Sequence, residues 1–311
     1  MGKPSFVIRF WQYQRERFPI LQNGIMITVF TFSAVVYSIC ARSGKGFIPW
    51  RSLAAGVLTS ICFFYLLRVF DEFKDAVDDA KFRPYRPVPR GLVSLNELRR
   101  SGLVVVLTQV AVNLAIMPRM IIPYGMVLVY MGLMRQEFFV SEWLRKHPIV
   151  YLISHMMVMP LIDFYTTGLD WVNNRQMPAI GLYYFLAVTF CNGVVIEIGR
   201  KIRSQDAEET GVETYSALWG WKKATIVWLI VLGVTCVGAS AASFVAGFGI
   251  HALPFLIAML IGCAIPALRF LRQQHQQNAQ RIELAAGIWT VGMYLTLGVL
   301  PMVINLLQGL L

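Results

Sequence analysis

Acidic side chains are concentrated in one short segment of this sequence. Five of them fall within nine residues, at Asp71, Glu72, Asp75, Asp78 and Asp79. If the preceding helix continues through the segment, Asp71, Asp75 and Asp79 stack on one face with Glu72 at its flank. Stacked carboxylates repel one another unless a cation lies between them, and their hard oxygens suit Mg²⁺. The segment therefore predicts a magnesium site with Asp71, Glu72, Asp75 and Asp79 as ligands.

Basic side chains follow directly, at Lys81, Arg83, Arg86 and Arg90. Arginine matches phosphate oxygens through paired hydrogen bonds, and the prolines between the arginines favour a rigid, non-helical path. Acids for a metal followed by cations for phosphate indicate a diphosphate site. A solvated loop with no specific role would explain the arginines, but not five acids at the negative end of a helix dipole.

Long apolar stretches must position these charged segments. The 311 residues are 57% hydrophobic and 14% charged, whereas a soluble domain is about 25% charged. Apolar runs of about 18 residues or more are typical of helices that cross a bilayer. The sequence predicts an all-α membrane protein with about nine such helices, at 21–41, 50–70, 102–118, 120–138, 148–166, 178–198, 222–247, 251–271 and 284–310.

The distribution of basic residues predicts the orientation of these helices. With the N-terminus in the cytosol, residues 1–20 and the loops after the second, fourth, sixth and eighth helices carry 22 of the 28 Lys and Arg. Five lie on the other side, and Arg68 lies within a helix. Basic residues favour cytosolic loops. Residues 71–101 and 199–221 are then long cytosolic loops, and 1–20 reads as an interfacial amphipathic helix. The chain, 1–311, is expected to form a single polytopic domain.

The composition also excludes other classes of protein. The net charge of +11 does not indicate nucleic acid as a partner, because no basic segment is interleaved with aromatic residues as single-strand binders require. The five cysteines form no C-x-x-C pair, which argues against a zinc site or a disulfide framework.

Residues 71–94 resemble the first motif of the UbiA superfamily of intramembrane prenyltransferases, which has the form N-D-x-x-D-x-x-x-D followed by R-P and then by Gly and Ser. The resemblance covers essentially the whole chain, including the long loops after the second and sixth helices. It implies a helical bundle around a central cavity and catalysis by Asp75, Asp79 and Arg86. The positions that carry the resemblance are Asp71 in place of the Asn, Glu72 in place of the first Asp, then Asp75, Asp79, Arg86, Pro87, Gly91 and Ser94.

The family has a second pair of acids after its sixth helix, and this sequence departs from that pattern. Glu197 is the candidate for a catalytic metal ligand here, but Lys201 stands four residues later, where an acid is expected. Asp206 can supply the missing acid as a metal ligand. Alternatively, Arg200 and Lys201 can bind the diphosphate directly, and the sequence leaves both readings open.

The fourth and fifth predicted helices contain two further pairs of candidate functional residues. Tyr130 and Arg135 resemble a tyrosine-then-basic pattern of ubiquinone-type members and are predicted to bind substrate, although Met134 stands where a Lys is expected. His155 and Asp163 lie eight residues apart on one helix face, and ionisable groups at membrane depth are candidates for function.

The resemblance implies a Mg²⁺-dependent enzyme that ionises an isoprenyl diphosphate and transfers the prenyl group to a small acceptor, with an aromatic molecule as one candidate. Its partners are then the diphosphate, the acceptor and the lipid bilayer, and we expect it in a bacterial inner membrane with its active-site loops in the cytosol. One alternative is a UbiA-type terpene cyclase that needs no acceptor. Another is a non-enzymatic lipid-diphosphate carrier or transporter, although the inverted repeats typical of transporters are not visible in the sequence.

Overall fold

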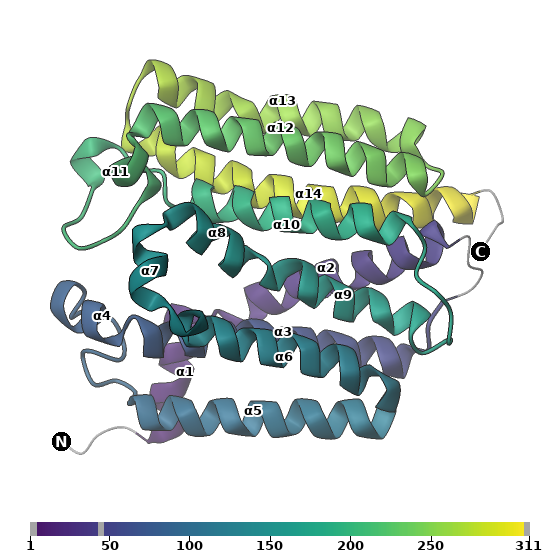
Figure 1. The fold of residues 1–311 in the computed structure, drawn as a ribbon, viewed down its shortest axis with the longest axis horizontal. Helices are drawn as coiled ribbons and strands as arrows, with labels where there is room; N and C mark the ends of the chain where they lie inside the picture. The colour runs from purple at the N-terminus through teal and green to yellow at the C-terminus, as the bar shows by residue number, and fades with distance from the viewer. Residues whose placement is uncertain (1–4, 43–46, 308–311) are drawn as a thin grey trace.

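The structure, a computed structural model, describes residues 5–42 and 47–307. These residues form helices and connecting turns, and no strand occurs among them. The long helices run side by side (Figure 1), as expected in a bilayer, where a helix satisfies its own backbone hydrogen bonds. The prediction of an all-α fold is confirmed.

Eight helical stretches are long and apolar enough to cross a membrane, which supports an integral membrane protein. Their outward faces carry exposed apolar side chains, such as Leu103, Val104 and Leu107, which suit contact with lipid. The eight are Ile20–Ala41 (α2), Trp50–Lys74 (α3), Leu95–Ile116 (α5), Pro148–Trp171 (α8 with α9), Gly181–Gly199 (α10), Trp221–Val245 (α12), Gly249–Arg272 (α13) and Gln276–Leu307 (α14).

Two of the predicted segments take a different form from that expected. Residues 120–138 form a shorter helix, Ile121–Arg135 (α6), after a 3₁₀ turn at Pro118–Met120 (η1), so length alone does not make α6 a ninth span. Residues 148–166 are divided at Met157 into Pro148–Met156 (α8) and Val158–Trp171 (α9).

Short helices gather at one end of the bundle, which we call the loop end (Figure 1). The helix Phe6–Arg17 (α1) lies within the predicted interfacial segment 1–20, of which residues 1–4 are outside the described residues. The loops predicted at 71–101 and 199–221 are also at this end, but α3 and α5 extend into the first of them. The other short elements are Ala76–Phe82 (α4), Ser141–Lys146 (α7), Tyr215–Trp219 (α11), and the 3₁₀ turns Glu137–Phe139 (η2) and Gln205–Ala207 (η3).

The core has two main parts, one containing α10 and the other α3. The C-terminal ends of these two helices lie at the loop end (Figure 1). One part lies among α10, α12, α13 and α14, and the other among α2, α3, α6 and α9. Helix α2 joins them, because it packs on both α14 and α9. The approach of α2 to α14 is close: a Cβ added at Gly298 would lie 2.4 Å from the Cα of Ser33. Small residues allow helices in membranes to approach in this way.

Candidate functional site

The acidic segment lies where α3 passes into α4. The helix axis breaks at Asp75, with φ −86° and ψ 1°, but the backbone ladder continues because Asp75 N donates to Asp71 O at 2.9 Å and Asp79 N to Asp75 O at 2.8 Å. The predicted continuous helix is therefore bent at its middle carboxylate. Because of this bend, the acids do not share one environment.

Glu72 faces helix α1. Its side chain is buried, at 1% exposure, and its Oε1 accepts a hydrogen bond from Arg17 Nε at 2.5 Å. Burial alone would lower the pKa of the Arg17 guanidinium, but the nearby Glu72 carboxylate raises it above its ordinary value. Glu72 thus fastens the N-terminal helix to the end of α3.

Asp79 is also buried, beneath the arginines that follow it. Arg86 Nη1 donates to both of its carboxylate oxygens, at 2.8 and 2.7 Å, and Arg83 Nη1 lies 3.0 Å from Oδ1. The sequence predicted these arginines as ligands of phosphate. In the structure they hold Asp79 and are themselves held next to the acidic segment.

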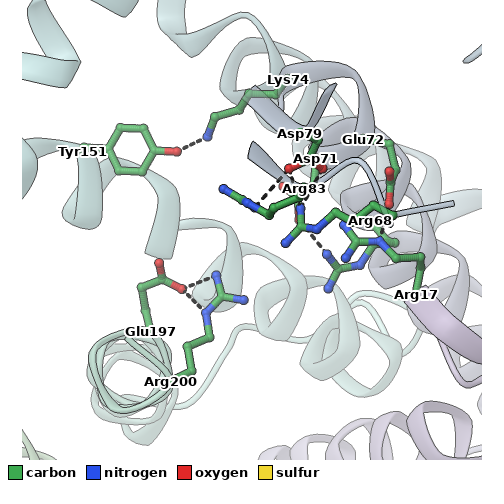
Figure 2. Close-up of polar contacts among 11 residues, drawn as sticks. Arg17, Arg68, Asp71, Glu72, Lys74, Asp79, Arg83, Tyr151, Glu197 and Arg200 are labelled. Atoms are coloured by element: carbon green, nitrogen blue, oxygen red, sulfur yellow. Dashed lines mark hydrogen bonds and ion pairs between the residues drawn. The ribbon is translucent and has the colours of Figure 1, made fainter. Parts of the chain in front are cut away.

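Asp71 has a more open environment and lies across from α10 (Figure 2). Its nearest cation is Arg68, 3.5 Å away, and 45% of its side chain stays accessible. On the opposite side Arg200 is 46% accessible. Burial would lower the pKa of Arg200, but Glu197 and then Asp71 hold it above its ordinary value. Both side chains have protein around them and are still partly accessible to water, and we call the space between them, at the loop end, the recess.

Glu197, in the last turn of α10, forms ion pairs with the two cations that follow it. Arg200 Nη2 lies 2.5 Å from Oε2, and Lys201 Nζ lies 2.9 Å from Oε1. The carboxylate is 6% exposed, so its interactions are almost entirely with protein. The structure brings Glu197, Arg200 and Lys201 together as one cluster facing Asp71.

Other residues predicted for the site lie apart from this recess. Lys81 is exposed over the ring of Phe82, and Asp206 is exposed in η3. Arg90 pairs with Glu16 at 2.6 Å on the outside.

The two residues predicted near the acceptor take part in packing. The Tyr130 hydroxyl donates to the backbone carbonyl of Ser154 at 2.7 Å. Arg135 lies over the ring of Phe73, 4.9 Å from its centre. The contact of Tyr130 lies away from the acidic segment, whereas Arg135 reaches that segment through Phe73 and pairs with none of its acids.

Two cations at the site were not singled out from the sequence. Arg68 lies one turn before Asp71, and its buried Nε has no hydrogen-bond partner. A charged residue in an apolar run is itself a signal of function, and this signal could have identified Arg68. Lys74 contacts the Tyr151 hydroxyl (Figure 2). It also lies 3.5 Å from His155 Nε2. The partners of Lys74 come from α8 and from η2, where Glu137 lies 3.7 Å away, and no sequence spacing reveals either.

The carboxylates can be tested for their fit to Mg²⁺. Among residues 5–42 and 47–307, no three or more His, Cys, Asp or Glu side chains are grouped to form a complete metal centre. Mg²⁺ needs only one or two carboxylates when substrate phosphates and waters complete its shell. Asp71 and Asp75, one turn apart, meet this requirement, because in the described ranges Asp75 forms no ion pair and Asp71 only a long one. The first segment therefore fits one Mg²⁺, whereas Glu197 already has two cationic partners.

Comparisons with known proteins agree with the arrangement of helices. A family model, the UbiA prenyltransferase family, matches residues 25–301. A UbiA homologue from Aeropyrum pernix K1, solved in its apo form, is similar with a TM-score of 0.65 at 12% identity, covering 90% of this chain and 98% of its own. A structure from work on digeranylgeranylglyceryl phosphate synthase in membranes has a TM-score of 0.62 at 14% identity, with 93% and 97% covered. Among curated proteins, none matches this chain in sequence.

Proposed function

Because this chain belongs to the UbiA prenyltransferase family, we propose that it ionises an isoprenyl diphosphate with Mg²⁺ and transfers the prenyl group to a small acceptor. The observation that carries the proposal lies at the loop end, where Asp71, one turn before Asp75, faces Arg200 across the space between α3 and α10. Paired carboxylates facing a cation suit a metal-bound diphosphate.

Asp71 and Asp75 are the proposed primary ligands of Mg²⁺, which when bound would stabilise the charge of the departing diphosphate. Glu72, Asp79, Glu197 and Asp206 stay predicted ligands. The first three would each have to exchange an arginine or lysine partner for the metal.

The cations have a separate proposed role. Arg83 and Arg86, already ordered by Asp79, can turn their remaining N–H groups to phosphate oxygens. Arg68 can do the same with its unpartnered Nε. Positive charge fixed in advance around the leaving group favours cleavage of the carbon–oxygen bond, because charge develops there in the transition state.

Capture of the resulting cation requires that water be kept away. The helices of the bundle supply apolar side chains, and the charged groups proposed to bind metal and diphosphate lie at the loop end. His155, Tyr130 and Arg135 are the proposed neighbours of the acceptor. The distribution of Lys and Arg along the chain supports a cytosolic loop end, and we propose that the membrane is a bacterial inner membrane.

The test is release of pyrophosphate by the purified chain, given a panel of isoprenyl diphosphates and candidate acceptors with Mg²⁺ or with EDTA. We expect Mg²⁺-dependent release that Asp75→Asn abolishes. Asp78→Asn is the matched control, because Asp78 is exposed on α4 three residues away, and it should retain activity.

Mass spectrometry of the products separates the alternatives. A prenylated acceptor supports the proposal, and a cyclised product formed without acceptor would instead identify a terpene cyclase. Metal-dependent binding without turnover of any substrate would favour a carrier or transporter. Retained release in Asp75→Asn would overturn the assignment of the site.

A further inference from the structure

Both carboxylate oxygens of Glu197 are paired with cations of the protein. Oε2 accepts from Arg200 Nε at 2.6 Å and lies 2.5 Å from its Nη2, while Oε1 lies 2.9 Å from Lys201 Nζ. Arg200 and Lys201 directly follow the last residue of α10, and backbone hydrogen bonds from their N–H groups to Ile196 O and Ile198 O hold them within about one turn of Glu197. A dication on Glu197 would therefore stay close to both cations, and this repulsion disfavours a metal ion there.

The end of α10 strengthens this preference. The last turn of a helix carries partial negative charge, which stabilises cations and destabilises carboxylates. Arg200 follows the last residue of α10, and Lys201 follows Arg200. Both cations are therefore stabilised at this position, and their ion pairs with Glu197 offset the unfavourable interaction of its carboxylate with the helix end.

The charge of the whole site points the same way. Six carboxylates and seven cations form the ion pairs and the acidic segment of the site, so these side chains alone are net positive by one. A prenyl diphosphate carries about three negative charges, by extension from the charge of a phosphate monoester, so one Mg²⁺ makes the complex about neutral and a second would leave it positive by about two. The groups are Asp71, Glu72, Asp75, Asp79, Glu137 and Glu197, with Arg17, Arg68, Lys74, Arg83, Arg86, Arg200 and Lys201.

Arg200 and Lys201 keep donors available for a ligand. Arg200 uses Nε and Nη2 on Glu197, which leaves Nη1, and nearly half of its side chain is accessible. Lys201 uses one of three ammonium hydrogens on Glu197 and is 32% accessible. Arg200 also lies near enough to Asp71 for the two charges to interact.

We infer that this chain binds its diphosphate with a single divalent ion, held by Asp71 and Asp75, and that Arg200 and Lys201 bind the diphosphate directly where a second ion would lie. Glu197 is then a positioning residue, which orients the two cations and does not ligate metal. This inference rests on the proposed function and concerns the same site.

The experiment counts metal ions. Mn²⁺ is titrated into the purified full-length chain with a prenyl thiolodiphosphate, an analogue that resists ionisation, and bound Mn²⁺ is measured by electron paramagnetic resonance. We expect one Mn²⁺ per chain, and the same number in Glu197→Gln. Lys201→Asp, which removes a cation and adds a carboxylate one turn from Glu197, should raise the number to two.

Analogue affinity gives an independent readout. Arg200→Ala and Lys201→Ala should each weaken binding of the thiolodiphosphate about tenfold or more, because each removes a charge-assisted hydrogen bond, while one Mn²⁺ is still bound. Arg203→Ala is the matched control: Arg203 pairs with the exposed Glu209 at 3.0 Å, and its loss should change neither quantity. Thermal unfolding of every variant confirms that it is folded.

The outcomes separate the two proposals. Two Mn²⁺ ions in the wild type, loss of Mn²⁺ in Glu197→Gln, or unchanged analogue affinity in both alanine variants would overturn the single-ion inference and leave the proposed function standing. No binding of the analogue at any Mn²⁺ concentration would contradict the proposed function itself.

Discussion

Arg17 Nε lies 2.5 Å from Glu72 Oε1, and this contact joins helix α1 to the acidic segment of α3. The carboxylate is 1% exposed and the arginine side chain 14%. The first acidic position of the motif is therefore used, in this structure, to hold the N-terminal helix across the loop end. Its neighbour Asp71 is left to face the recess.

Removing one partner of this pair should destabilise the protein strongly. Arg17→Met leaves Glu72 buried without its cation, and the loss for a buried pair is about 3–5 kcal/mol. We expect a clearly lower apparent Tm in detergent for Arg17→Met and for Glu72→Gln, and a double variant less affected than the sum of the two.

The pair between Arg90 and Glu16 is a matched control for that measurement. It also links α1 to the loop between α4 and α5, with 2.6 Å between Arg90 Nη2 and Glu16 Oε1, but both side chains are 34% exposed. An exposed pair contributes about 0–1 kcal/mol. If Arg90→Met lowered Tm as much as Arg17→Met, burial would not be the cause of the difference.

The sequence predicted the long helices well, because they depend on local patterns of apolar residues, but it predicted a continuous helix through the acidic segment, which bends at Asp75. The break between α8 and α9 also has a local cause: Pro160 has no N–H and its ring crowds the carbonyl of Met156, a signal that was present but not used. In contrast, the partners of Glu72 and Asp79 could not be predicted. Several cations lie near each carboxylate in the sequence. The packing of α1 and the bend at Asp75 determine which of them forms the ion pair.

The turn after α6 could not be predicted either, and it leads to another test. Glu137, Phe138 and Phe139 adopt φ values of 47°, 54° and 61°, a left-handed conformation that costs non-glycine residues about 1 kcal/mol or more each. Phe139 is 76% exposed. We expect Phe139→Gly to stabilise the protein by about 1 kcal/mol, measured as a rise in the unfolding midpoint in SDS.

Two other glycine substitutions test whether relief of backbone strain causes the stabilisation expected for Phe139→Gly. Phe138→Gly should not stabilise, because its ring packs on Tyr130 and His155. Val77→Gly, at an exposed position in helix α4, should destabilise by about 0.5 kcal/mol. Stabilisation by Val77→Gly equal to that at Phe139 would contradict the explanation.

Because α2 and α14 are in close contact at Gly298, adding one methyl group there should lower the stability of the protein strongly. At Gly298 an added Cβ would lie 2.4 Å from Ser33 Cα, which is backbone and cannot turn aside. Gly298→Ala should therefore separate the two helices and cost about 1–3 kcal/mol. At Gly287, on the same helix, an added Cβ meets nothing within 4 Å, so Gly287→Ala should be neutral or stabilising. Equal unfolding midpoints for the two variants would refute this account of the interface.

A buried hydrogen bond between α9 and α14 gives the last prediction. The Tyr294 hydroxyl donates to Asp163 Oδ2 at 2.6 Å, with exposures of 1% and 3%. Tyr294→Phe removes the hydroxyl donor and leaves the buried Asp163 carboxyl group without this hydrogen bond. The free energy of unfolding should fall by about 1–3 kcal/mol. Asp163→Leu removes the carboxyl group itself, so adding Tyr294→Phe to that variant should cost much less. The coupling is measured by a double-mutant cycle in SDS unfolding. An additive cycle would mean that the bond contributes nothing, because a hydrogen bond that joins the two helices must make the effect of one change depend on the other.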